Sequence, residues 1–323
     1  MGWLTWRQHR GEALATAVVV TLVVAVLVVT GTSLHHAFER DGAAACLGVA
    51  SERGGDCDAL VSGFLDRYQS QVNLIIPWLT MFPVLAGLFL GAPLLAREFE
   101  HGTWQLAWTQ TVSRTRWLIA KVAALVALAV LSSLAVTVTY TWWRTPVTRV
   151  EGRFGPEGFN LEGVVPIAYT LFAFALGAAA ALILRRTVPA IAATFAGFLL
   201  IRLPVEGWLR PRYRAPVRLV FDPIINPDAN RFGTTGDWVL AKGFADTNGR
   251  PLTNAQIARV RAASAAEHLD IPTYLHTHGL QRWYQYQPAR RFWTFQLLEA
   301  GIFVTAAVLL LAAVTVTIHR NPA

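Results

Sequence analysis

The sequence contains six long apolar runs, and runs of this length place a chain in a membrane. A helix needs about 20 predominantly apolar residues to cross the roughly 30 Å hydrocarbon core of a bilayer. The chain is 54% hydrophobic and only 15% charged, so long stretches carry almost no charge. The runs are Ala13–Leu34, Asn73–Ala96, Trp117–Tyr140, Val164–Leu184, Val188–Val205 and Phe292–Ile318. We therefore predict an all-α membrane protein with six transmembrane helices.

Positive residues beside these runs predict the orientation, because short cytoplasmic flanks are enriched in Arg and Lys. An inside N-terminus puts most of the flanking positive charge on the cytoplasmic side. These residues are Arg7, Arg10, Arg97, Arg114, Arg116, Lys121, Arg185, Arg186 and Arg320. The net charge of +8 is thereby explained by membrane flanks, and no nucleic-acid partner is expected. Both termini are predicted to lie in the cytoplasm of a bacterial cell.

The segments outside the runs complete the predicted organisation. Residues 1–12 combine Trp and Arg, which suits a short helix lying at the membrane interface ahead of the helices in 13–205. Residues 206–291 are too long to be a simple connector, and a loop of this length translocates regardless of its charge. We predict an extracytoplasmic domain there, partly helical over 253–269. Residues 292–323 form the sixth helix and a cytoplasmic tail.

Two cysteines, Cys46 and Cys57, both fall in the first predicted outside loop. An oxidising exterior permits a disulfide between them, worth roughly 2–3 kcal/mol in the chain-entropy model. Two free thiols are the alternative. A metal site is not expected, because the cysteines lack further ligands nearby and the pair His276 and His278 is a weak metal signature.

Ionisable residues inside an apolar run are costly and normally face a partner or a cavity. Glu299 lies about two turns into the sixth run, and Arg202 lies near the outer end of the fifth. We expect them to form an intramembrane ion pair, with a structural role favoured over contact with a substrate. The sequence has no GxxxxGK[ST] phosphate loop, so no nucleotide cofactor is expected on this chain.

Two stretches carry a resemblance to a known family. Pro93–Lys121 reads PLLAREFEHGTWQLAWTQTVSRTRWLIAK, and Gln287–Phe303 reads QPARRFWTFQLLEAGIF. Together with the six runs, they resemble the permease subunit of bacterial ATP-binding-cassette exporters of the type-2 group, in its actinobacterial form. The region 206–291 is larger than the short re-entrant segment common in that family, which makes the shape of an exit pathway an open question.

The resemblance implies a mechanism that the residues alone do not give. Within segment 96–116, the acidic stretch after the second helix would form a coupling helix that seats on a separate ATPase. That role is carried to Arg97, Glu98, Phe99, Glu100, His101, Gly102 and Thr103. A second permease chain, identical or not, and membrane lipids are the other partners expected, and ATP would be bound and hydrolysed by the ATPase.

Two other functions stay open at this point. The chain is either not an enzyme, as the resemblance implies, or a membrane enzyme with its site in 206–291, near His276 and His278. It is alternatively a sensor or accessory subunit acting through the same region. The enzyme alternative needs a cluster of ionisable groups that the sequence does not contain.

Overall fold

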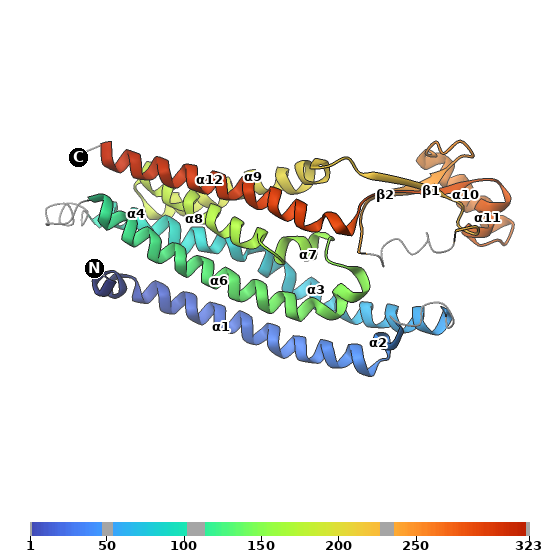
Figure 1. The fold of residues 1–323 in the computed structure, drawn as a ribbon, viewed down its shortest axis with the longest axis horizontal. Helices are drawn as coiled ribbons and strands as arrows, with labels where there is room; N and C mark the ends of the chain where they lie inside the picture. Colours follow the sequence, from blue (N-terminus) through green and yellow to red (C-terminus); the bar gives the residue numbers. More distant parts are fainter. Residues whose placement is uncertain (1, 47–53, 102–113, 227–235, 321–323) are drawn as a thin grey trace.

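The computed structural model describes residues 2–46, 54–101, 114–226 and 236–320. Within these ranges six helices are long and apolar enough to cross a membrane. They cover Arg10–Arg40, Ala59–Glu100, Ile119–Glu151, Val165–Leu184, Thr187–Arg212 and Ala289–Arg320. The six predicted membrane helices are thereby confirmed, and both chain ends lie at the same end of the bundle (Figure 1).

The membrane helices are assembled from the following elements. The first three spans are α1 (Gly2–Arg40), then α3 (Gly54–Ala86) with the π-helix η1 (Gly87–Gly91) and α4 (Ala92–His101), then α6 (Arg114–Glu151). The last three are α8 (Val165–Leu184), then α9 (Thr187–Pro204) with η2 (Val205–Leu209) and η3 (Arg210–Arg212), then α12 (Phe292–Arg320). Short helices α2 (Ala43–Cys46) and α7 (Pro156–Leu161) cap the bundle.

Several of the membrane helices extend beyond their predicted ends, among them α1 and α6. Helix α6 continues past Tyr140 to Glu151 because its apolar stripe continues there, with Trp143, Val147 and Val150 buried at helical spacing. Residues 1–12 were predicted as a short helix at the membrane interface; residues 2–12 are helical and continuous with the membrane helix, and their place at the interface stays a prediction. They are the first turns of α1, since no proline interrupts the helical hydrogen bonds before Arg40.

Helix α8 is the centre of the bundle, and α1 is at its edge. The apolar window of α8 is 61% buried, whereas that of α1 is 6% buried and packs mainly on α6. The small residues of α8 let η1 approach at backbone distance. A Cβ added to Gly177 would lie 2.5 Å from the Gly87 carbonyl oxygen, and one added to Gly87 would collide with the Ala173 carbonyl. Close backbone contact between small residues is a usual way to hold helices together in lipid.

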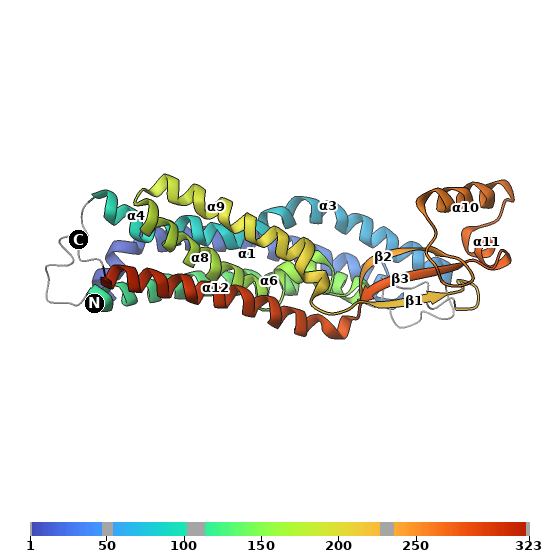
Figure 2. The same cartoon turned by 90° about the horizontal axis from the view of Figure 1, so that it is seen from above.

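Residues 217–226 and 236–287 form a small α/β unit, the sheet domain, beyond the end of the bundle opposite to the termini (Figures 1 and 2). Strands β1 (Val217–Phe221), β3 (Gln281–Gln287) and β2 (Trp238–Ala245) pair antiparallel in that order. Helices α10 (Asn254–Ala266) and α11 (Ile271–Thr277) lie between β2 and β3 in sequence. The helix expected over 253–269 is present, and Thr253 starts it with a capping box. The sheet was not predicted.

The sheet domain is attached to the bundle at the start of α12. The 3-10 turn η5 (Ala289–Arg291) links β3 to α12. Nε2 of Gln287, which is fully buried, donates to the carbonyl of Arg214 at 2.7 Å, and the rings of Phe154 and Trp238 lie 5.7 Å apart. The domain therefore packs on the α6–α8 connection and on the end of α9.

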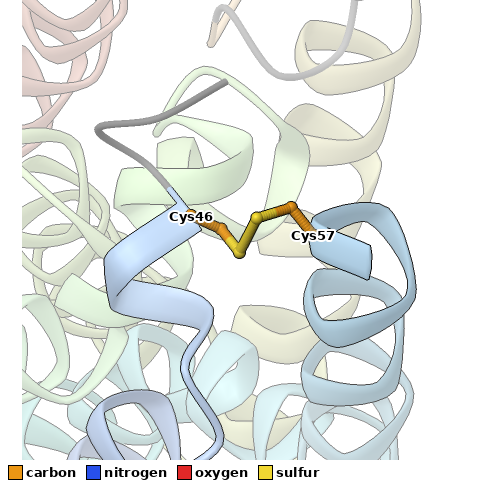
Figure 3. The surroundings of a disulfide bond; sticks show 2 residues. All are labelled: Cys46 and Cys57. Carbon is orange, nitrogen blue, oxygen red and sulfur yellow. A yellow bond between two sulfur atoms is a disulfide. The ribbon is translucent and has the colours of Figure 1, made fainter. Parts of the chain in front are cut away.

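A disulfide closes the hairpin between α1 and α3 at the same end of the molecule. Cys46 ends α2 and Cys57 lies in the first turn of α3, with their Cα atoms 5.5 Å apart (Figure 3). The sulfurs are bonded, and of the two alternatives open from the sequence the structure has the disulfide. This hairpin and the sheet domain both project from the end opposite to α4 and the termini (Figure 1).

Candidate coupling segment and buried ion network

Helix α4 forms the end of the second span on the side of the termini, where the coupling segment was predicted. Its first residues are fully packed, with Ala92, Leu94, Leu95 and Ala96 between 0 and 2% exposed. Its last turn becomes polar: Arg97 and Glu100 are exposed, and Glu98 and Phe99 are half-buried. His101 ends the helix, while Gly102 and Thr103 lie outside the described residues.

Two ion pairs connect this last turn to the flanking helices. Nη1 of Arg97 donates to Oε1 of Glu12 in α1 at 2.9 Å. The carboxylate of Glu98 pairs with Lys121 of α6, whose side chain is only 5% exposed. A lysine this well buried holds its charge only beside an acid. Glu98 is therefore a fixed structural contact between α4 and α6.

The same turn also contacts the connection between α8 and α9. Both the backbone N–H and the hydroxyl of Thr187 donate to the Glu100 carboxylate, at 2.9 and 2.6 Å. The guanidinium of Arg185 lies 5.7 Å from the centre of the Phe99 ring. Because Thr187 is the first residue of α9, Glu100 also occupies the N-terminal end of that helix, where a negative charge is favoured. The α4 turn is thus held by α1, α6 and α9 together.

A second polar group lies at the other end of the bundle, around Glu299. This residue of α12 is 0% exposed, and Arg210 is 2% exposed. Nε of Arg210 donates to Oε2 at 2.8 Å and Nη2 donates to Oε1 at 2.7 Å, which is a bidentate pair. The hydroxyls of Tyr169 and Tyr213 donate to the same carboxylate, the latter at 3.1 Å. Burial and the adjacent Glu299 raise the pKa of the Tyr213 hydroxyl, which keeps it a neutral donor.

The predicted pairing of Glu299 with Arg202 is wrong. Arg202 points instead to Thr80, whose carbonyl accepts from Nη1 at 2.7 Å, and its Nε lies 3.7 Å from Oε2 of Glu206. Its guanidinium also stacks 4.8 Å from the centre of the Tyr169 ring. The fifth span continues beyond its apolar run through η2 and η3, and this extension brings Arg210 level with Glu299. A prediction that ends the span at residue 205 cannot find that partner.

A third buried pair, between Arg144 of α6 and Glu162, was not predicted from the sequence. The two side chains are 3% and 2% exposed, with Nη1 of Arg144 3.4 Å from Oε1 of Glu162. Nη1 also donates to the Gly152 carbonyl at 2.9 Å. Burial raises the pKa of Glu162, while the charges of Arg144 and Arg153 lower it and do not fully offset the burial. The signal available in the sequence was the long polar tail of α6, which exceeds what a span requires.

The histidines of the sheet domain make local contacts. Nδ1 of His276 lies 2.8 Å from Oδ2 of Asp222, and Nε2 of His278 lies 3.7 Å from Oε1 of Glu267. The His278 ring stacks on Tyr274 with centroids 4.0 Å apart. Within the described part of the chain, no group of three or more His, Cys, Asp or Glu side chains is placed to hold a metal ion.

A cavity of about 500 Å³ lies between α1, the α3–η1 segment and α6. Its walls are mainly aliphatic and aromatic, with Val19, Val20, Phe82, Leu85 and Phe89 among them. Its volume falls within the roughly 300–1,000 Å³ typical of small-molecule sites. The Arg97–Glu12 pair lines it as well, so the cavity reaches the turn of α4 described above.

Six apolar helices with ion pairs buried between them define a polytopic α-helical membrane protein. The model of the family described as ABC-2 membrane transporter related matches residues 17–210, and the chain belongs to this family. It is therefore a permease-type transport subunit, a multi-pass protein of a bacterial plasma membrane. No curated protein and no solved structure matches the chain. The sheet domain and α12 lie beyond the matched residues.

Proposed function

We propose that this chain is the permease subunit of an ATP-driven exporter and that a separate ATPase acts on it through Arg97–Thr103. Family membership supports the class, because permeases of this family generally work with an ATP-binding-cassette ATPase subunit. The observation that carries the coupling assignment is the turn of α4, which is held on three sides by α1, α6 and α9. A displacement of this turn is transmitted to three membrane helices at once.

The orientation follows from charge and from the disulfide. Arg97, Lys121 and Arg185 gather around α4, on the side of the termini, and we place this side in the cytoplasm. The Cys46–Cys57 bond lies at the other end, where an oxidising exterior maintains it. This orientation also places the sheet domain outside the cell.

In this mechanism the chain supplies the pathway and its partner supplies the nucleotide chemistry. ATP changes the conformation of the permease only through a contact whose affinity differs between two states of the chain. That contact is the polar end of α4. The ion pairs at Glu12 and Lys121 make the turn rigid, so that a push on Arg97 or Glu100 moves whole helices. A second permease chain would complete the pathway, and an amphipathic compound would be the cargo.

Co-purification tests the coupling assignment. The tagged chain is expressed together with its neighbouring genes and purified in detergent. The amount of ATPase that co-purifies with it is then quantified. Reversing the exposed charge in Glu100→Arg is expected to release the ATPase. Glu39→Arg, the same change at an exposed position near the other end of α1, is the matched control and should leave it bound. Equal retention of the ATPase by both variants would contradict the assignment, and absence of any ATPase from the wild-type complex would contradict the exporter itself.

A further inference from the structure

The cavity between α1 and α3 is open at the side of the bundle as well as toward the α4 turn. Two of its lining residues, Val19 of α1 and Phe89 of η1, are 45% and 61% exposed. Helix α1 packs on α6 and contacts α3 little, so the seam between α1 and α3 is loosely closed. An occupant can therefore enter sideways from the hydrocarbon region without passing through the core of the bundle.

The chemistry of the walls selects an acyl chain. Apart from the charged end, the polar side chains lining the cavity are Thr16 and Ser132, and the Ser132 hydroxyl already donates to the Leu128 carbonyl at 2.7 Å. A water molecule in a protein cavity needs about two to four polar partners, and these walls do not supply them. A methylene chain finds a mainly apolar lining, because most of the remaining wall is aliphatic or aromatic.

The charged end of the cavity selects the headgroup. Arg97 and Glu12 pair there, but their side chains are 58% and 17% exposed, so the charge presented to an incoming molecule is mainly positive. A guanidinium offers five N–H donors in a fork that suits a phosphate or a carboxylate. An anionic headgroup would meet Arg97 while its chain lies against Val19 and Phe82.

We propose that this cavity binds one acyl chain of an anionic amphiphile taken from the leaflet on the side of the termini. The amphiphile contacts Arg97, one residue from the Glu98–Lys121 pair and within the turn to which the ATPase is assigned. The identification of the amphiphile as cargo, and its influence on the ATPase, rest on the proposed function. The existence of the binding site does not rest on it, since every lining residue belongs to this chain.

Photolabelling of the chain alone, in phosphatidylcholine nanodiscs and without ATPase, tests the site. The probe is lysophosphatidylglycerol with a diazirine in its acyl chain, and the labelled peptides are mapped by mass spectrometry. Labelling is expected on residues 15–20 and 82–90. Ala15→Phe, which fills the cavity from an exposed position, should reduce it about tenfold. Ala17→Phe makes the same change two residues further along α1, at an exposed position that does not line the cavity, and should leave labelling unchanged.

The headgroup is tested by charge. The zwitterionic lysophosphatidylcholine probe should label the same peptides several-fold less, and Arg97→Gln should remove that difference, while Arg10→Gln should retain it. Equal labelling of the Ala15→Phe and Ala17→Phe variants would overturn the site, because it would show only general contact with lipid. Cross-linking of residues 15–20 to a second copy of the chain would also overturn it. Neither result depends on whether an ATPase binds, so failure of the site is distinguishable from failure of the exporter assignment.

Discussion

The contact between Arg210 and Glu299 should be costly to break. Both side chains are at most 2% exposed, and two hydrogen bonds of 2.7 and 2.8 Å join them. Removing one partner of a buried pair leaves an uncompensated charge and typically costs about 3–5 kcal/mol. Glu299→Gln should therefore lower the free energy of unfolding by about that amount, a factor of roughly 10² to 5 × 10³ in the folding equilibrium.

Double-mutant cycles compare the Arg210–Glu299 pair with the Arg202–Glu299 pair that the sequence predicted. The free energy of unfolding is measured by SDS titration in mixed micelles for Glu299→Gln, Arg210→Gln and the double variant, and again with Arg202→Gln in place of Arg210→Gln. The coupling energy should be several kcal/mol for Arg210 with Glu299 and below about 1 kcal/mol for Arg202 with Glu299. Arg202 reaches Glu299 indirectly, through the Tyr169 side chain that contacts both and through Glu206 and Arg210. Equal coupling energies for the two cycles would refute the assignment.

Replacing both partners tests why the pair is costly to break. A buried ion pair is expensive to desolvate, and apolar residues of similar volume often replace it at little loss. The variant carrying Arg210→Met and Glu299→Met should recover much of the stability lost by either single substitution. If it is instead less stable than both, the pair contributes net attraction beyond satisfying two buried charges, and the desolvation argument fails.

Three further predictions concern packing, the disulfide and pH. Gly177→Ala should destabilise the bundle by about 1–3 kcal/mol through collision with the η1 backbone, whereas Gly301→Ala, with nothing within 4 Å of the added Cβ, should not; thermal unfolding in detergent compares them. Cys57→Ser should lower stability by about 3 kcal/mol by opening a bridge across 11 residues, and dithiothreitol should produce the same loss in the wild type but none in the variant. Slight burial raises the pKa of Asp222, but hydrogen bonds from His276 and two backbone N–H groups outweigh it, so the pKa is lowered. The ionised carboxylate therefore contributes stability above the ordinary carboxyl pKa of about 3.9, and this contribution is lost as the pH falls through the lowered pKa. Asp222→Asn should remove this loss at low pH when the thermal unfolding temperature of the sheet domain is measured as a function of pH. An unchanged pH dependence in the variant would exclude the Asp222 contact as its source.

The membrane helices could be predicted because the constraint on them is local. In hydrocarbon each backbone N–H and C=O must be satisfied within its own segment, so any apolar run of sufficient length becomes a helix. The predicted starts and ends of α8, α9 and α12 agree with the structure to within about two residues. The capping residue Thr253 likewise marks the start of α10 by chemistry within a single turn.

The errors occurred where structure depends on neighbours in space. Beyond the hydrocarbon, α3 and α6 continue because they pack on other helices, and hydropathy does not report that packing. The short strand β3 is rich in Trp, Tyr and Gln, and it becomes a central strand only because β1 and β2 pair with both of its edges. Strand pairing joins residues far apart in sequence, so composition alone does not predict it.

The sequence by itself determined that this is a six-helix membrane protein, resembles an ABC-2 permease and has a polar segment after its second span. Only the tertiary structure decided which arginine meets Glu299 and which helices hold the end of α4. The physical reason is that hydropathy and helix capping act along a few turns of one chain segment. The partner of a buried charge is instead fixed by the depth and rotation of two packed helices. Here η2 and η3 extend the fifth span by about two turns past Arg202, and Arg210 takes the place expected for Arg202.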